Sequence, residues 1–380
     1  MVRWRAGRAG DAAGVTALLT DEPRTSVPDG IDPTLQPRPR RRRPWARRLR
    51  FGLSLAVGAA LTALALPTVT GVTWTQLAPA AAQVSVPWLA GLVVLWLVGL
   101  LAHTVTLTGA MPGLTHRRAL TLSLTGSAVA NVVPLGGAAG IALNYRMART
   151  WGHSGTAIGT YTVVTNIWDV LAKFLLPLLA MPVLLLAGPA LGSTAVYAGL
   201  LAALVLAVIT AAGLAMLSSP TAAARAGGLG DRALGRWLRG RSCRTALVGL
   251  QAGTSAVVRT GWRRLSLGMV LYTALLFALL WACLTVTGVV LAPAAVLAGF
   301  AVERLLTLAG LTPGGAGVVE VGLATTLLAF PGSPAGIALG VLLYRALTFG
   351  LEIPVGGLTL AGWLVAQRRP ARPGPTVAVD

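Results

Sequence analysis

The chain has 380 residues, of which 55% are hydrophobic and only 11% are charged. A soluble domain carries about 25% charged residues, so this composition excludes an ordinary soluble protein. The net charge of +20 could indicate a nucleic-acid-binding protein. The basic residues, however, flank apolar segments, as the positive-inside rule predicts for membrane proteins. We therefore expect no nucleic-acid partner.

The first 50 residues are basic and rich in Arg and Pro, with twelve of the 31 Lys and Arg residues of the chain. No short apolar region with a cleavage site follows them, so they do not resemble a signal peptide. Their composition predicts a disordered basic cytoplasmic tail over residues 1–50. The arginine run at 38–43 is either an anchor that fixes topology or a site for anionic phospholipid headgroups.

The rest of the chain is a series of apolar segments, many of them near the roughly 20 residues that a membrane-crossing helix needs. They lie at 51–67, 86–108, 119–133, 155–187, 192–217, 265–289, 294–311, 315–330 and 335–366. This pattern predicts an all-α fold, a polytopic helical membrane protein with one transmembrane domain over 51–366.

Charge in the connecting segments predicts the topology. The connections at 68–85, 188–191, 290–293 and 331–334 carry no charge, whereas those at 109–118 and 218–264 are basic. We place the basic segments in the cytoplasm. The protein is then expected in the cytoplasmic membrane with both termini inside, a basic cytoplasmic loop at 218–264 and a cytoplasmic tail at 367–380. Within that loop, residues 232–239 form either an amphipathic surface helix or a plain loop.

The same charge map predicts two inverted repeats, residues 51–190 and 192–366. Each has two spans, a helical hairpin broken by Pro and Gly, and a long last span, a layout common in transporters. The first hairpin, 117–152, breaks at Pro134, Gly136 and Gly137, and the second, 290–334, at Pro313, Gly314 and Gly315. Proline and glycine interrupt helices. Each hairpin is either re-entrant or a pair of short crossings.

Seven charged residues fall inside the predicted spans, where charge is costly and usually faces a partner or a cavity. They are Asp169, Lys173, Glu303, Arg304, Glu320, Arg345 and Glu352. Asp169 and Lys173 are four residues apart and can pair on one helix face. The others gather near the second break. They form either a closed salt-bridge network or a site in which the two arginines bind a lipid phosphate, assisted by backbone N–H groups after the glycines.

The sequence lacks the signatures of a catalytic or metal site. The histidines have no metal-binding spacing, and no metalloprotease, serine-hydrolase or nucleotide-binding motif occurs. The two cysteines, Cys243 and Cys283, do not suggest a disulfide. We therefore expect no enzyme activity, no cofactor and no metal.

Six segments together resemble a known family. They are Asn131–Gly140, Tyr145–Arg146, Asn166–Asp169, Glu303–Arg304, Leu311–Glu320 and Leu343–Phe349. They are similar to the transmembrane region of the lysylphosphatidylglycerol synthase family, also called the flippase-like domain. Full-length members join this region to a soluble aminoacyltransferase domain. Only 14 residues follow Ala366, so the resemblance implies a stand-alone flippase-like protein, whose substrate is a polar lipid, a phospholipid or an isoprenoid lipid.

The sequence thus predicts a lipid translocase that moves a polar or phospholipid headgroup across the cytoplasmic membrane. The alternative is a non-transporting subunit or scaffold of a lipid- or glycan-modifying enzyme. The expected partners are the lipid substrate and anionic phospholipid at the basic cytoplasmic segments, and a homo-oligomer is left open. The candidate substrate-binding residues are Asn131, Pro134, Gly136, Gly137, Asp169, Lys173, Glu303, Arg304, Pro313, Gly314, Gly315, Glu320, Tyr344 and Arg345.

Overall fold

The computed structural model of the protein describes residues 44–133, 136–186, 193–234, 242–309 and 312–368. The chain divides into a short N-terminal unit, residues 1–46, and a compact unit, residues 47–380. Of the first unit only residues 44–46 are described, and the fold below is that of the second. The predicted tails lie almost wholly outside the described residues.

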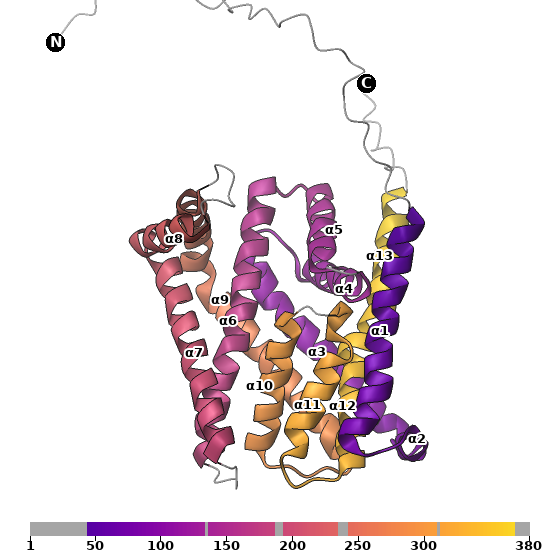
Figure 1. Cartoon of the computed structure of the whole chain (residues 1–380). Helices are drawn as coiled ribbons and strands as arrows, with labels where there is room; N and C mark the ends of the chain where they lie inside the picture. Colours follow the sequence, from indigo (N-terminus) through magenta and orange to yellow (C-terminus); the bar gives the residue numbers. More distant parts are fainter. Residues whose placement is uncertain (1–43, 134–135, 187–192, 235–241, 310–311, 369–380) are drawn as a thin grey trace, which may run out of the picture. The chain divides into compact units, whose positions relative to one another are not determined.

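Every regular element in these ranges is helical (Figure 1). In chain order they are α1 (Pro44–Thr70), α2 (Trp74–Ala82), α3 (Val86–Ala110), α4 (His116–Val132), α5 (Gly136–Thr150), α6 (Gly155–Leu186), α7 (Ser193–Ser218), α8 (Pro220–Leu234), α9 (Cys243–Val286), α10 (Pro293–Ala309), the short turn η2 (Pro313–Gly315), α11 (Val318–Leu328), α12 (Pro334–Arg345), the π-helical turn η3 (Ala346–Gly350) and α13 (Glu352–Arg368).

Four helices within the described ranges are long and apolar enough to cross a membrane. They are α3, α6, α9 and the stretch from Pro334 to Arg368 that combines α12, η3 and α13. A bent pair taken from α7 and α8, with an angle of 118° between its halves, is a fifth candidate. The predicted fold class, an all-α polytopic membrane protein, is confirmed. The inverted relation between the two halves stays a prediction.

Both predicted hairpins are present, and they enter from opposite ends. In Figure 1, α4 and α5 lie near the end where α6 begins, whereas α10 and α11 lie near the other end. The turn η2, at the tip of the second hairpin, packs against α4 of the first. Whether each hairpin is re-entrant or a pair of short crossings stays a prediction.

The segment predicted as a basic loop is largely helical where it is described. It contains α8 and the first half of α9, which begins at Cys243 instead of the predicted 265. The carboxylate of Asp231 fixes this early start, since it accepts hydrogen bonds from the backbone N–H groups of Cys243 at 2.5 Å and of Arg244 at 3.3 Å. These bonds satisfy donors that a helix N-terminus leaves unpaired.

The predicted last span, 335–366, is interrupted by the π-helical turn η3. One backbone hydrogen bond of this turn spans five residues instead of the usual four, since the N–H of Leu351 donates to the carbonyl of Ala346 at 2.7 Å. Pro354, one turn further on, has no N–H to offer the Gly350 carbonyl, so a regular ladder would be incomplete here in any case. The bulge changes the direction of side chains between Arg345 and Glu352, which lie at its two ends.

Close contacts at small residues hold α4 in place. A Cβ at Gly356 of α13 would collide with the carbonyl oxygen of Leu124, and one at Gly140 of α5 would lie 2.7 Å from that of Gly126. Small residues allow this close approach of helix backbones in membranes. Helix α4 is therefore packed tightly against both α13 and α5, and the Asn131 side chain near its end has a defined position.

Candidate functional site

The described part of the chain contains a cavity of about 830 Å³ where the two broken hairpins meet. Its walls come from both breaks, from α6, α9 and α10, and from the stretch around η3. The lining residues that carry polar groups or form the breaks are Ser127, Asn131, Gly136, Gly137, Asp169, Lys173, Tyr272, Arg304, Thr307, Thr312, Pro313, Gly314, Gly315, Arg345, Thr348 and Glu352. Polar and charged groups thus face an internal space in an otherwise apolar helical unit.

The second break lies close to the end of α4, just before the first break. The Asn131 side-chain oxygen lies 3.0 Å from the position that a Cβ of Gly314 would take, and the ring of Phe349 lies closer still. Gly314 has a φ of +60°, in the left-handed region that favours glycine. Both its backbone conformation and its surroundings therefore require a residue without a side chain.

A buried ion pair fixes the second break to the end of α12. The Arg345 Nε donates to Glu320 Oε1 at 2.8 Å, and its Nη2 donates to the Gly314 carbonyl at 2.7 Å. The other Glu320 oxygen accepts the Gly317 N–H at 2.6 Å, which caps α11. Both charged side chains are almost fully buried. Arg345 lines the cavity, whereas Glu320 lies behind it and lines a smaller groove of about 370 Å³ near Trp74.

The second arginine of this half has a similar arrangement. Arg304 forms an ion pair with the neighbouring Glu303, and its Nη2 donates to the Tyr344 hydroxyl at 3.3 Å. Glu303 and Tyr344 are completely buried. The guanidinium also lies over the ring of Phe300, 5.5 Å from its centre. Only Arg304 of this group lines the cavity.

Helix α6 supplies the predicted pair of the first half. Lys173 Nζ lies 2.7 Å from Asp169 Oδ2, as the four-residue spacing predicts. The Asp169 side chain is 41% exposed, and that of Lys173 is 14% exposed. Tyr272 of α9 also lines the cavity, and its ring stacks on that of His103 at 4.4 Å.

The structure brings most of the predicted site residues together around this one cavity. Asn131, Gly136, Gly137, Asp169, Lys173, Arg304, Pro313, Gly314, Gly315 and Arg345 line it. Glu303, Glu320 and Tyr344 do not line it and instead hold the two arginines. Pro134 lies outside the described residues. Which of these residues bind a substrate stays a prediction.

Several lining residues were not in the predicted set. Glu352 was recognised only as a charge within a span, and the structure places it on the cavity wall, where Asn131 Nδ2 donates to its Oε2 at 3.4 Å. Ser127, Tyr272, Thr307 and Phe349 carry no distinctive spacing in the sequence. No local signal could have found them, because they meet only through packing between distant helices. In the residues that were described, no group of three His, Cys, Asp or Glu side chains could hold a metal ion.

These features define a class, a polytopic helical membrane protein with two broken hairpins that meet at a charged internal cavity. The chain matches the family described as the lysylphosphatidylglycerol synthase TM region over residues 51–356. The match covers most of the chain, and the protein belongs to this family. It includes both breaks and every charged residue that lines the cavity. No curated protein matches the chain.

Proposed function

We propose that this protein translocates a lipid with a polar headgroup across the cytoplasmic membrane. The observation that carries the proposal is the cavity between the two hairpin tips, which is lined by Arg304, Arg345 and the Asp169–Lys173 pair. A headgroup that crosses a bilayer must exchange water for other polar partners, because unsatisfied polar groups are costly in hydrocarbon. This cavity would supply such partners within the membrane.

The arginines suit a phosphate even though each already has an acidic partner. A guanidinium has five N–H donors in a planar fork that matches phosphate geometry. Glu320 and Gly314 accept from two nitrogen atoms of Arg345, so further donor capacity exists on its cavity side. The glutamates would keep both arginines charged and oriented while headgroups enter and leave.

Translocation can be measured in liposomes that contain phospholipids with fluorescent headgroups, from the exposure of inner-leaflet label to an impermeant reductant. We expect the protein to expose the label and protein-free liposomes not to do so. Gly137→Trp should reduce the rate to the protein-free level, because Gly137 lines the cavity and a Cβ there meets nothing within 4 Å. The added ring would fill the cavity without disturbing the backbone.

Gly159→Trp is the matched control, since Gly159 of α6 is also exposed, has no atom within 4 Å of its Cβ position and does not line the cavity. This variant should translocate at the normal rate. If the unmodified protein behaves like protein-free liposomes with every headgroup tested, the non-transporting subunit would be the better interpretation.

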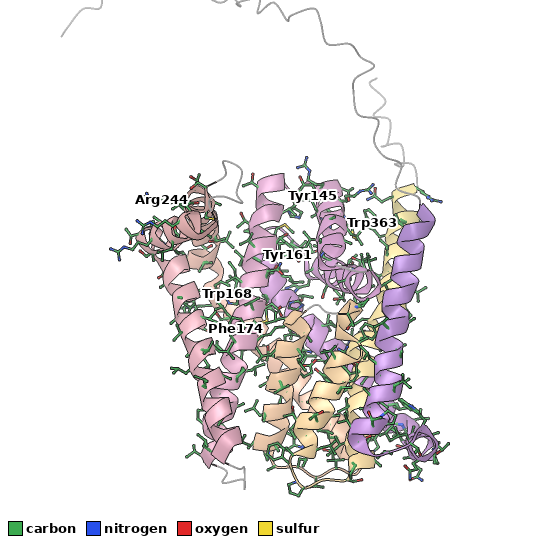
Figure 2. All side chains as sticks on the ribbon, in the orientation of Figure 1. Tyr145, Tyr161, Trp168, Phe174, Arg244 and Trp363 are labelled. Carbon is green, nitrogen blue, oxygen red and sulfur yellow. The ribbon has the colours of Figure 1, made fainter. Side chains whose placement is uncertain are left out.

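We also propose that the end formed by α5, α8 and the start of α9 faces the cytoplasm. Tyr145 and Arg244 mark this end in Figure 2. Basic residues at the ends of α4 and α5 and on α8 support this orientation, whereas α2 and the loops at 287–292 and 329–333 carry no charge. A groove of about 600 Å³ between α8 and α9 is lined by Arg225, Arg232 and Arg244. Anionic phospholipid headgroups are the partners that we propose for it.

Cys243 is a native reporter for this orientation. It is partly exposed at the start of α9, whereas Cys283 is buried. An impermeant maleimide should label the protein in inside-out membrane vesicles and leave it unlabelled in intact cells, and Cys243→Ser should remove the signal. Labelling in intact cells would reverse the proposed orientation.

The same thiol can report occupancy of the groove, because Arg244 is its neighbour in the chain. In detergent, an added anionic phospholipid should slow the reaction of Cys243 with N-ethylmaleimide, while a zwitterionic one should not. The double variant Arg225→Gln, Arg232→Gln should remove the difference. An equal effect of both lipids would contradict a headgroup site in the groove.

A further inference from the structure

The charged groups around the cavity do not balance. Three acids each have a basic partner, in the pairs Asp169–Lys173, Glu303–Arg304 and Glu320–Arg345. Glu352 is a fourth acid, and no Lys, Arg or His nitrogen of the described residues lies within 4.0 Å of its carboxylate. With every group ionised, the site would carry one excess negative charge, and that charge belongs to Glu352.

The immediate partners of Glu352 are neutral. The Asn131 amide of α4 donates to it at 3.4 Å, and Ser127 of the same helix also lines the cavity. Glu352 itself is only 9% exposed, and it lines the cavity close to Asn131 of α4. Glu352 therefore lies inside the protein but within reach of whatever fills the cavity.

Charged and titratable groups on the other elements face Glu352 from a greater distance. They are Arg304 of α10, Arg345 of α12, Tyr272 of α9 with His103 of α3 stacked on it, and the Asp169–Lys173 pair of α6. The charged residues of α4, Arg117 and Arg118, lie at its opposite end. Neither arginine is an ion-pair partner for Glu352, because no nitrogen atom of either lies within 4.0 Å of its carboxylate.

A lone carboxylate in a low-dielectric site is expensive to keep ionised when its only partners are neutral donors. A proton removes this cost by forming an O–H bond on the carboxyl group. Water in the cavity can deliver the proton and take it back, so no further reactant is needed. Proton exchange with each side in turn would require the cavity to open alternately to the two sides.

We propose that Glu352 binds and releases a proton during each transport cycle, so that lipid translocation is coupled to proton movement across the membrane. This inference rests on the proposed function. Protonation would neutralise the cavity in one state, and deprotonation would restore the excess negative charge in the other. Proton transport would then be a second activity of the same site.

Glu352→Gln tests the coupling, because it keeps the size of the side chain and one oxygen that can accept from Asn131, and it fixes the charge at zero. In proteoliposomes with an enclosed pH-sensitive dye, the unmodified protein should show proton flux during translocation, and an imposed pH gradient should change the rate. Glu352→Gln should show no proton flux and no response to the gradient.

Two further readouts separate proton binding from a structural role. The infrared spectrum should contain a carboxylic-acid carbonyl band that is absent in Glu352→Gln and retained in Asp169→Asn. Asn131→Leu removes the amide that donates to the ionised carboxylate, which favours the protonated form. Its pH profile for translocation should therefore shift to higher pH, whereas a residue that only packs against α13 would leave the midpoint unchanged.

The coupling would be overturned if Glu352→Gln kept the proton flux or the infrared band. It would also be overturned if this variant failed to translocate only lipids with cationic headgroups and kept its response to the gradient. Glu352 would then be a counter-ion for the headgroup. If the unmodified protein translocates no lipid at any pH, the proposed function fails, and the infrared band still decides whether Glu352 holds a proton.

Discussion

Arg345→Ala is expected to abolish translocation and to lower the stability of the protein. The change leaves Glu320 as an unpaired charge whose side chain is only 5% exposed, and it removes the donor to the Gly314 carbonyl. Breaking one partner of a buried ion pair costs about 3–5 kcal/mol. Glu320→Ala should have a similar cost, because it also removes the cap of the Gly317 N–H. Thermal unfolding in detergent measures the loss of stability, and the liposome assay measures the loss of translocation.

The double variant Glu320→Leu, Arg345→Met separates structure from function. Replacing a buried ion pair by apolar residues of similar size is often neutral for stability, so the melting temperature should recover relative to either single variant. Translocation should not recover, because Arg345 lines the cavity and its guanidinium is lost. Normal translocation by a stable double variant would mean that the pair is purely structural and that the headgroup binds elsewhere, with Asp169 and Lys173 the next candidates.

Gly314→Ala is the second change from which we expect a large loss of translocation. Gly314 has a φ of +60°, and the left-handed conformation costs about 1–2 kcal/mol for a residue with a side chain. The new Cβ would also collide with the ring of Phe349 and approach the Asn131 oxygen. Overpacking of this kind typically costs about 1–3 kcal/mol. The tip of the second hairpin should therefore move away from the first.

Phe349→Ala offers a specific rescue. In the double variant Gly314→Ala, Phe349→Ala the collision with the ring is gone, and only the backbone strain and the close approach to the Asn131 oxygen remain. Both stability and translocation should therefore recover in part. Gly137→Ala is the matched control in the first break, since its Cβ position is open and its backbone has no positive φ. If Gly314→Ala translocates normally, contact between the two breaks is not needed for transport.

The sequence by itself determined the membrane class, the approximate spans and the positions of both breaks. These features follow from local chemistry. A long apolar stretch can only be helical in a bilayer, and proline and glycine interrupt a helix wherever they occur. The Asp169–Lys173 pair was also predictable, because a four-residue spacing places two side chains on one helix face.

Only the tertiary structure decided how these parts combine. Local sequence could not show that Asp231 of α8 would cap an early start of α9, or that a π-helical turn would divide the last span. It also could not separate Arg345, on the cavity wall, from Glu320, behind it. Asn131 and Glu352 are 221 residues apart and meet because α4 packs against α13. Such contacts depend on how whole helices pack, which side-chain spacing along one helix does not specify.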